Sequence, residues 1–168
     1  MGKLWDIIRE YFDTDDGSLP EIQIQNLSAR ELAAAYELIR AGSKIVGERP
    51  VFWHKGNNAE LLLDDVPNAA ALVADFQAEP FHFVVEGLSF DGATIPTLGI
   101  FVFQQAIALD YRMGSHWGEP EVRALFGLVR RIVAHEPKAQ ITFEDGATLE
   151  AIKTLHQAWA VYEGYVKD

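Results

Sequence analysis

The sequence predicts an α+β fold in which about five helices cover a largely antiparallel central sheet of about four to six strands. Three observations lead to this prediction. Segments with apolar residues at helical spacing lie at both ends and between extended segments, the middle of the chain is rich in strand patterns, and the two kinds of segment do not alternate regularly as a parallel βαβ sheet would require. With 168 residues, no repeat and no long linker, the chain is expected to form a single domain over 1–168.

The predicted helices are amphipathic, and the second has the clearest start. Ser28 and Glu31 have the spacing of a capping box, so each side chain can satisfy an amide of the first turn. Leu27 and Leu32 have the spacing of a hydrophobic staple, and Gly42 follows the expected C-terminus. The five predicted segments are 3–12, 29–41, 67–76, 119–134 and 148–166.

The third helix is expected to begin near Pro67 and to turn its apolar side chains inward, Phe76 among them. The strand patterns leave one alternative open. In 98–112 the alternation fails at Gln104 and Gln105, so this segment is either one bulged strand or two antiparallel strands joined by a turn. The predicted strands are 21–25, 51–54, 81–90, 98–112 and 139–143.

The composition narrows the classes of protein that fit. The chain has no cysteine, which excludes disulfides, thiolate metal sites and cysteine nucleophiles. Residues 1–13 lack the plan of a signal peptide, and no apolar run approaches the roughly 20 residues of a membrane span. These features predict a soluble, cytoplasmic protein that does not enter a membrane.

The charge distribution is the most informative feature. The net charge is −11, and residues 56–111 contain no lysine or arginine. Such a segment repels phosphate backbones, which argues against nucleic-acid binding, and it attracts a basic partner. The acids of the segment are Glu60, Asp64, Asp65, Asp75, Glu79, Glu86, Asp91 and Asp110.

No complete catalytic or metal motif occurs. The acidic turn at 13–17 fails the register of a calcium loop, and 87–92 places its second glycine one residue too late for a nucleophile elbow. His82 and Glu86 share a strand face but lie about 13 Å apart along the strand, too far to bind one metal by themselves. We therefore predict no cofactor and no bound metal, and we favour a non-catalytic protein over an enzyme.

One local group deserves a chemical reading. His116, Trp117 and Glu119 come just before a strong helix, and Asp110 precedes them. The histidine and the carboxylates would suit a small enzyme or a small-molecule site, with His54 as a further candidate, whereas Trp117 would suit an interface anchor. The alternative is purely structural, with Trp117 packed beneath the helix start and His116 capping a turn.

The leading hypothesis is a non-catalytic, acidic binding protein, of the inhibitor or immunity type found in bacteria, that docks onto a basic protein. It requires the carboxylates to form one coherent negative surface. The alternative is the enzyme or small-molecule binder just described, and a homodimer formed through an exposed strand or helix face is a further option. The expected partner-binding residues are Glu60, Asp64, Asp65, Asp91, Asp110, His116, Trp117 and Glu119.

Overall fold

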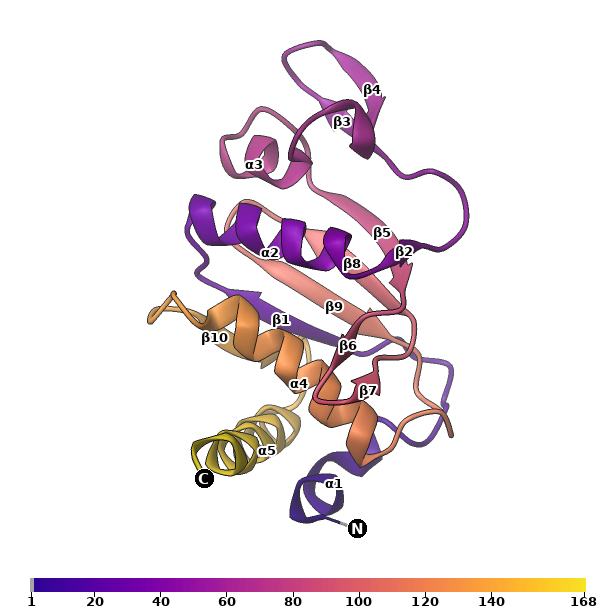
Figure 1. The fold of residues 1–168 in the computed structure, drawn as a ribbon, viewed down its shortest axis with the longest axis vertical. Coiled ribbons are helices and arrows are strands. Elements are labelled where there is room, and N and C mark those ends of the chain that lie inside the picture. The colour runs from indigo at the N-terminus through magenta and orange to yellow at the C-terminus, as the bar shows by residue number, and fades with distance from the viewer. Residues whose placement is uncertain (1) are drawn as a thin grey trace.

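The computed structural model describes residues 2–168 and confirms the α+β prediction (Figure 1). Its centre is a six-stranded sheet in the order β10-β1-β9-β8-β5-β2, and every neighbouring pair of strands is antiparallel. The strands of this sheet are β1 Glu21–Gln25, β2 Lys44–Ile45, β5 Phe81–Glu86, β8 Leu98–Val102, β9 Ile107–Tyr111 and β10 Gln140–Phe143.

Each of the five predicted helical segments contains a helix. Helices α2 and α4 lie across the same face of the sheet, and α1 and α5 lie at the end of the molecule where both termini are found (Figure 1). Within residues 2–168, no helix combines the length and the apolar character that crossing a membrane requires. The helices are α1 Lys3–Ile8, extended by the 3₁₀ turn η1 Arg9–Tyr11, then α2 Ala29–Ala41, α3 Ala69–Ala74, α4 Glu119–Val133 and α5 Leu149–Lys167.

The hairpin alternative for 98–112 is the correct one. Strands β8 and β9 pair in register, and the Phe103 amide donates to the Ala106 carbonyl oxygen at 2.9 Å across the turn that contains Gln104 and Gln105. The predicted strand 81–90 is interrupted, because Gly87 takes a φ of +93° that L side chains rarely adopt. The chain then forms a short hairpin of β6 (Ser89–Phe90) and β7 (Ala93–Thr94).

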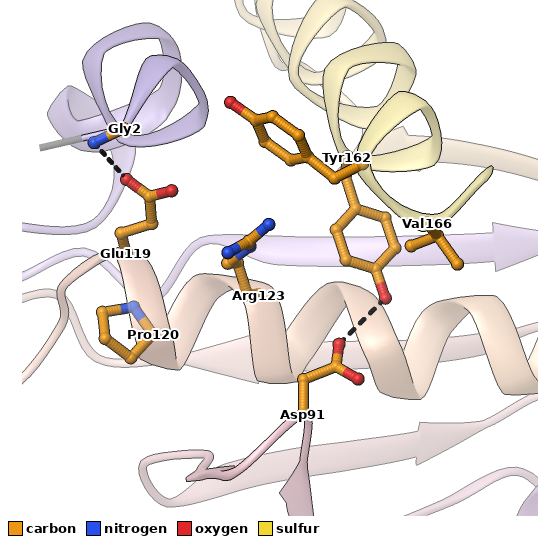
Figure 2. A pocket seen from close by; sticks show the side chains of 8 residues that line it. Gly2, Asp91, Glu119, Pro120, Arg123, Tyr162 and Val166 are labelled. Carbon is orange, nitrogen blue, oxygen red and sulfur yellow. Dashed lines mark hydrogen bonds between the residues drawn. The ribbon is translucent and has the colours of Figure 1, made fainter. Parts of the chain in front are cut away.

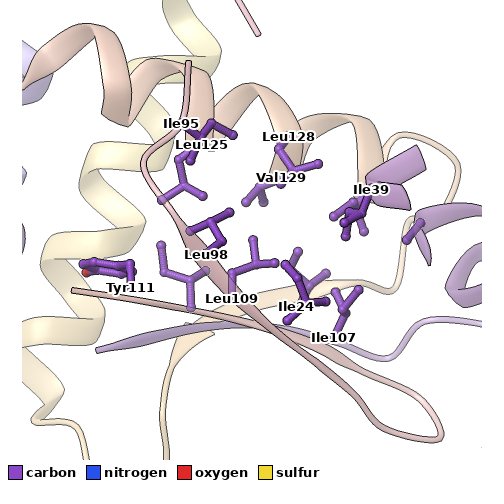
Figure 3. Close-up of a cluster of buried hydrophobic side chains, with 14 of the residues drawn as sticks. Ile24, Ile39, Ile95, Leu98, Ile107, Leu109, Tyr111, Leu125, Leu128 and Val129 are labelled. Atoms are coloured by element: carbon purple, nitrogen blue, oxygen red, sulfur yellow. The ribbon is translucent and has the colours of Figure 1, made fainter. Parts of the chain in front are cut away.

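The core lies between α4 and the sheet (Figure 3). The helix directs Leu125, Leu128 and Val129 onto the strands, where they meet residues such as Leu98 and Leu109. All five side chains are fully buried, and burying one such side chain contributes about 1.5–3 kcal/mol. The apolar periodicity of 119–134 therefore identified the helix face that builds the core.

The start of α2 confirms half of the predicted capping box. The Ser28 hydroxyl accepts a hydrogen bond from the Glu31 amide at 3.3 Å, as expected. The Ser28 amide, however, donates to the Glu136 carboxylate at 3.2 Å. A residue after α4 thus satisfies the amide that the sequence pattern assigned to Glu31, and this contact ties α2 to the end of α4.

The prediction for Phe76 is wrong. Its side chain is 64% exposed and its φ is +60°. Helix α3 ends at Ala74, two residues before Phe76, because the chain must reverse there to run beside β3 (Val51–His54). An isolated bridge between His54 and Ala78 marks this return, and the reversal turns Phe76 outward.

Candidate functional site

The eight carboxylates of 56–111 do not form one surface. Three of them lie on separate elements: Glu86 is paired in register with Lys44 at the edge of the sheet, Asp91 accepts a hydrogen bond from Tyr162, and Asp110 contacts His82. The other five lie within residues 51–79, which we call the hairpin unit: Glu60, Asp64, Asp65, Asp75 and Glu79. The hairpin unit is therefore the one part of the described structure that carries several of these carboxylates.

The hairpin unit projects from one end of the sheet (Figure 1). It consists of the antiparallel pair β3 and β4 (Ala59–Leu62), the 3₁₀ turn η2 (Leu63–Asp65) and α3. The Asn68 side chain caps α3 by accepting from the Ala71 amide at 3.0 Å, and it also donates to the Ala33 carbonyl oxygen of α2 at 3.0 Å. Helix α3 is thereby held against α2, and the hairpin extends beyond it.

Strand β3 lies between β4 on one side and residues 77–79 on the other. On the β4 side, Trp53 is directly opposite Glu60. On the other side, the Glu79 amide donates to the Trp53 carbonyl oxygen at 3.0 Å, and the Lys55 amide donates to the Gln77 carbonyl oxygen at 2.8 Å. Because directly opposed residues point to the same face, Trp53 lies in one row between Glu60 and Glu79.

This row is open to solvent. Trp53 is 42% exposed, Val51 on the same face is also 42% exposed, and both glutamates are exposed. The other face of β3 is packed, since Phe52 is buried with its ring centroid 6.0 Å from that of Phe81. Strand alternation thus leaves two apolar side chains exposed on the outside of the hairpin unit. Together with the two glutamates they form a surface that we call the docking face: Val51, Trp53, Glu60 and Glu79.

Two of the five carboxylates are matched by cations from other positions. Arg40 of α2 forms an ion pair with Asp64, and Lys55 lies 4.0 Å from Glu79. Asp65 accepts from the Leu62 amide at 3.1 Å and so stabilises the start of η2. Of the predicted partner-binding residues, Glu60 is the one that lies on the docking face, and Asp64 and Asp65 have structural contacts.

The group 116–119 is mainly structural. Trp117 is buried, and its ring packs 4.9 Å from Phe12 and 5.2 Å from Tyr111 between centroids. Its indole N–H donates to the Arg112 carbonyl oxygen at 2.8 Å, and the His116 ring contacts the same oxygen at 3.1 Å. Trp117 is therefore an internal anchor for the β9–α4 connection, which corrects its assignment as an interface anchor.

Asp110 faces away from this group, because it follows Leu109 and precedes Tyr111, whose side chains point to the helix-covered side. Its carboxylate crosses β8 and lies 2.7 Å from His82 Nε2 on β5. The crossing requires Gly99, where a Cβ would collide with the Asp110 carboxylate oxygens. This pair was not predicted from the sequence, where its signal is a glycine inside an otherwise apolar strand.

A cavity of about 640 Å³ opens between the start of α4 and the end of α5 (Figure 2). Two predicted residues meet there. Glu119 accepts a hydrogen bond from the Gly2 amide at 2.6 Å, and Asp91 accepts one from the Tyr162 hydroxyl at 3.2 Å. We call this the α4–α5 cavity, and its lining residues are Gly2, Asp91, Glu119, Pro120, Arg123, Tyr162, Tyr165 and Val166.

The lining of the α4–α5 cavity includes one cation, Arg123, and two tyrosines, Tyr162 and Tyr165. Arg123 lies over the Tyr165 ring, with its guanidinium carbon 4.7 Å from the ring centroid. Burial, and after it the neighbouring Asp91 carboxylate, raise the pKa of Tyr162 to about 12. Tyr162 is therefore a neutral hydrogen-bond donor at physiological pH.

The expected enzyme site of His116, Glu119 and Asp110 is not assembled by these contacts. His116 contacts Arg112, Glu119 contacts Gly2 and Asp110 contacts His82, and within residues 2–168 no hydrogen bond or ion pair joins any two of the three. His54 accepts from the Asn57 amide in the β3–β4 turn, at 3.0 Å.

Neither a metal-ligand cluster nor a known relative identifies the site. Within residues 2–168, no three His, Asp or Glu side chains are grouped closely enough to hold a metal ion. No protein-family model matches the chain, and neither a curated protein nor a solved structure matches it.

Proposed function

We propose that this protein is a non-catalytic binding protein that docks onto a basic protein through the docking face. The observation that carries the proposal is an exposed tryptophan between two exposed glutamates, Glu60–Trp53–Glu79. Neighbouring positions across strands place Cβ atoms about 4.5–5.5 Å apart, so one arginine or lysine side chain can meet both a carboxylate and the indole ring.

The chemistry of this row suits a cation. A guanidinium over a tryptophan face is stabilised by about 0.5–2 kcal/mol. Glu60, which forms no ion pair within residues 2–168, adds a charge-assisted hydrogen bond, whereas Glu79 already has Lys55 nearby. Tryptophan surrounded by polar residues is also the usual composition of an interface hot spot. The hairpin unit carries five carboxylates against Lys55 as its one lysine or arginine, so long-range attraction would accelerate encounter with a basic protein and repel nucleic acid.

The proposal includes a biological class. A small, acidic, cysteine-free protein that captures a basic partner fits the role of an inhibitor or immunity-type protein that neutralises a basic toxin in the bacterial cytoplasm. Residues Asp91, Asp110, His116, Trp117 and Glu119 are outside this docking face and take no part in the proposed contact.

The test measures capture of basic proteins by the immobilised full chain at low and at high salt, with the variants Trp53→Ala and Glu60→Gln/Glu79→Gln beside it. We expect wild type to retain a basic protein from lysate of the source organism at low salt, and both variants to retain at least tenfold less. Binding should weaken steeply as salt rises, because exposed charges are screened within about 8–10 Å at moderate ionic strength.

Two matched controls make the result specific. Leu149 is 76% exposed at the start of α5, and Glu121 is an acid of the first turn of α4. Leu149→Ala and Glu121→Gln remove an exposed apolar group and a carboxylate elsewhere, and both should bind as wild type does. Equal retention by Trp53→Ala and wild type, or retention that ignores salt, would refute the proposal.

A further inference from the structure

The α4–α5 cavity lies at the end of the molecule opposite the hairpin unit, so an inference about it is independent of the proposed docking (Figure 1). Its volume of about 640 Å³ falls within the range of about 300–1,000 Å³ typical of small-molecule sites. Its walls combine apolar surface from Pro120 and Val166 with a few convergent charged groups. Small-molecule sites likewise combine apolar walls with a few placed polar groups.

The charged residues of the cavity form no ion pairs with one another within residues 2–168. Arg123 points into the space beside Glu119 and Tyr162 (Figure 2), yet within residues 2–168 it forms no ion pair with a carboxylate. Its contact is with the face of Tyr165, which orients the guanidinium plane and leaves its edge N–H groups available. The cavity therefore presents an oriented, unsatisfied carboxylate receptor.

Each of the two carboxylates accepts a hydrogen bond through only one of its oxygens. Asp91 accepts through Oδ2 and Glu119 through Oε2, and the second oxygen of each accepts no hydrogen bond from another of residues 2–168. The contacts with Tyr162 and with the Gly2 amide also fix the direction of each carboxylate. The cavity thus holds one oriented cation, Arg123, with a fixed anion on either side of it.

We infer that the α4–α5 cavity binds a free α-amino acid, with the ligand carboxylate on Arg123 and the ligand ammonium on Asp91 or Glu119. A phosphate or a dicarboxylate would meet two carboxylates for one arginine and is disfavoured. A simple amine could pair with one of the two carboxylates, but it has no negative group that could bind Arg123. A zwitterion matches both signs, and charge-assisted hydrogen bonds of this kind are the strongest that such a site provides.

The remaining walls accommodate the rest of the ligand. Tyr162 is held as a neutral donor by its hydrogen bond to Asp91, and its ring forms one side of the space (Figure 2). Pro120 and Val166 offer apolar contact to an amino-acid side chain. These contacts would discriminate among amino acids, whereas the charged groups would recognise the backbone that all of them share.

The experiment titrates the full-length protein with each of the twenty free L-amino acids up to 10 mM and follows backbone amide signals by NMR. We expect at least one amino acid to saturate, with the shifts concentrated at residues 119–123 and 162–166. The N-acetylated and the decarboxylated analogues of that amino acid should each bind at least tenfold more weakly, because each lacks one of the two charges.

Variants separate the proposed contact from adventitious binding. Arg123→Gln should raise the Kd at least tenfold and Asp91→Asn/Glu119→Gln should do the same, while Arg30→Gln, an exposed arginine of α2, should leave the Kd unchanged. Thermal melts of all variants check that they are folded. The inference is overturned if no amino acid saturates by 10 mM, if the analogues bind as well as the parent, or if Arg123→Gln binds like wild type.

Discussion

The hairpin unit and α4 treat their apolar residues in opposite ways. Helix α4 buries its large apolar side chains against neighbouring elements: Leu125 faces the sheet, and Phe126 packs against the aromatic rings of α5. The hairpin unit packs one side of β3 through Phe52 but leaves Val51 and Trp53 in solvent, because a two-stranded ribbon has no second layer to cover its other face. An apolar residue therefore supports stability in one region and is available for binding in the other.

The largest expected loss of stability is at Leu125 in α4, and comparing it with the loss at Trp53 tests the difference between the two regions. Leu125→Ala should lower the free energy of unfolding by about 2–5 kcal/mol, because it removes a fully buried side chain and leaves a cavity beneath α4. Trp53→Ala, which deletes a larger but half-exposed ring, should cost clearly less. Urea denaturation of both variants measures the difference, and a Trp53→Ala cost equal to that of Leu125→Ala would contradict the distinction.

Gly99 sharpens the contrast within the sheet. Gly99→Ala should cost about 1–3 kcal/mol, because its Cβ would collide with the Asp110 carboxylate that reaches across to His82. In an Asp110→Ala background the same change should cost much less, since the colliding oxygens are gone. A double-mutant cycle by chemical denaturation gives the coupling, and additive costs would show that the carboxylate does not occupy this space.

A smaller loss of stability is expected at the start of α2, the helix that supports the hairpin unit. Ser28→Ala should lower the unfolding free energy by about 1 kcal/mol, because the hydroxyl caps α2, the helix against which α3 is held. Ser28→Thr retains a hydroxyl acceptor at the same position, adds no charge beside Glu136, and should keep most of the stability. Thermal or urea unfolding measures both, and equal losses in the two variants would rule out capping as the cause.

The smallest effect has the opposite sign. Phe76→Asn should raise stability by up to about 1 kcal/mol or leave it unchanged, because Phe76 is exposed and has a positive φ that asparagine adopts more readily. Urea denaturation measures the change. A clear loss of stability would mean that the Phe76 ring makes an important contact, and would weaken the description of the hairpin unit as an exposed surface.

The parts of the fold that were predictable depend on short-range patterns. The α4 helix was expected at 119–134 and is found at Glu119–Val133, and the Ser28 cap fixes the start of α2 as expected. The prediction for Phe76 failed because a long-range pairing, His54 with Ala78, ends α3 early. No periodicity within 67–76 contains that information.

The candidate sites were less predictable for the same reason. The acidic character of 56–111 directed attention to Glu60, but the row Glu60–Trp53–Glu79 depends on β3 pairing on both sides. Asp91 and Glu119 were both singled out, yet nothing in the sequence indicated that they share a cavity with Arg123.

The sequence by itself determined the α+β class, the helix starts and the apolar faces, because these follow from residues within one or two turns of each other. Only the tertiary structure decided which charges meet: His82 with Asp110 across Gly99, and Arg123 between two carboxylates. The reason is physical, since strand order and register bring distant segments together and are set by packing of the whole core rather than by any local pattern.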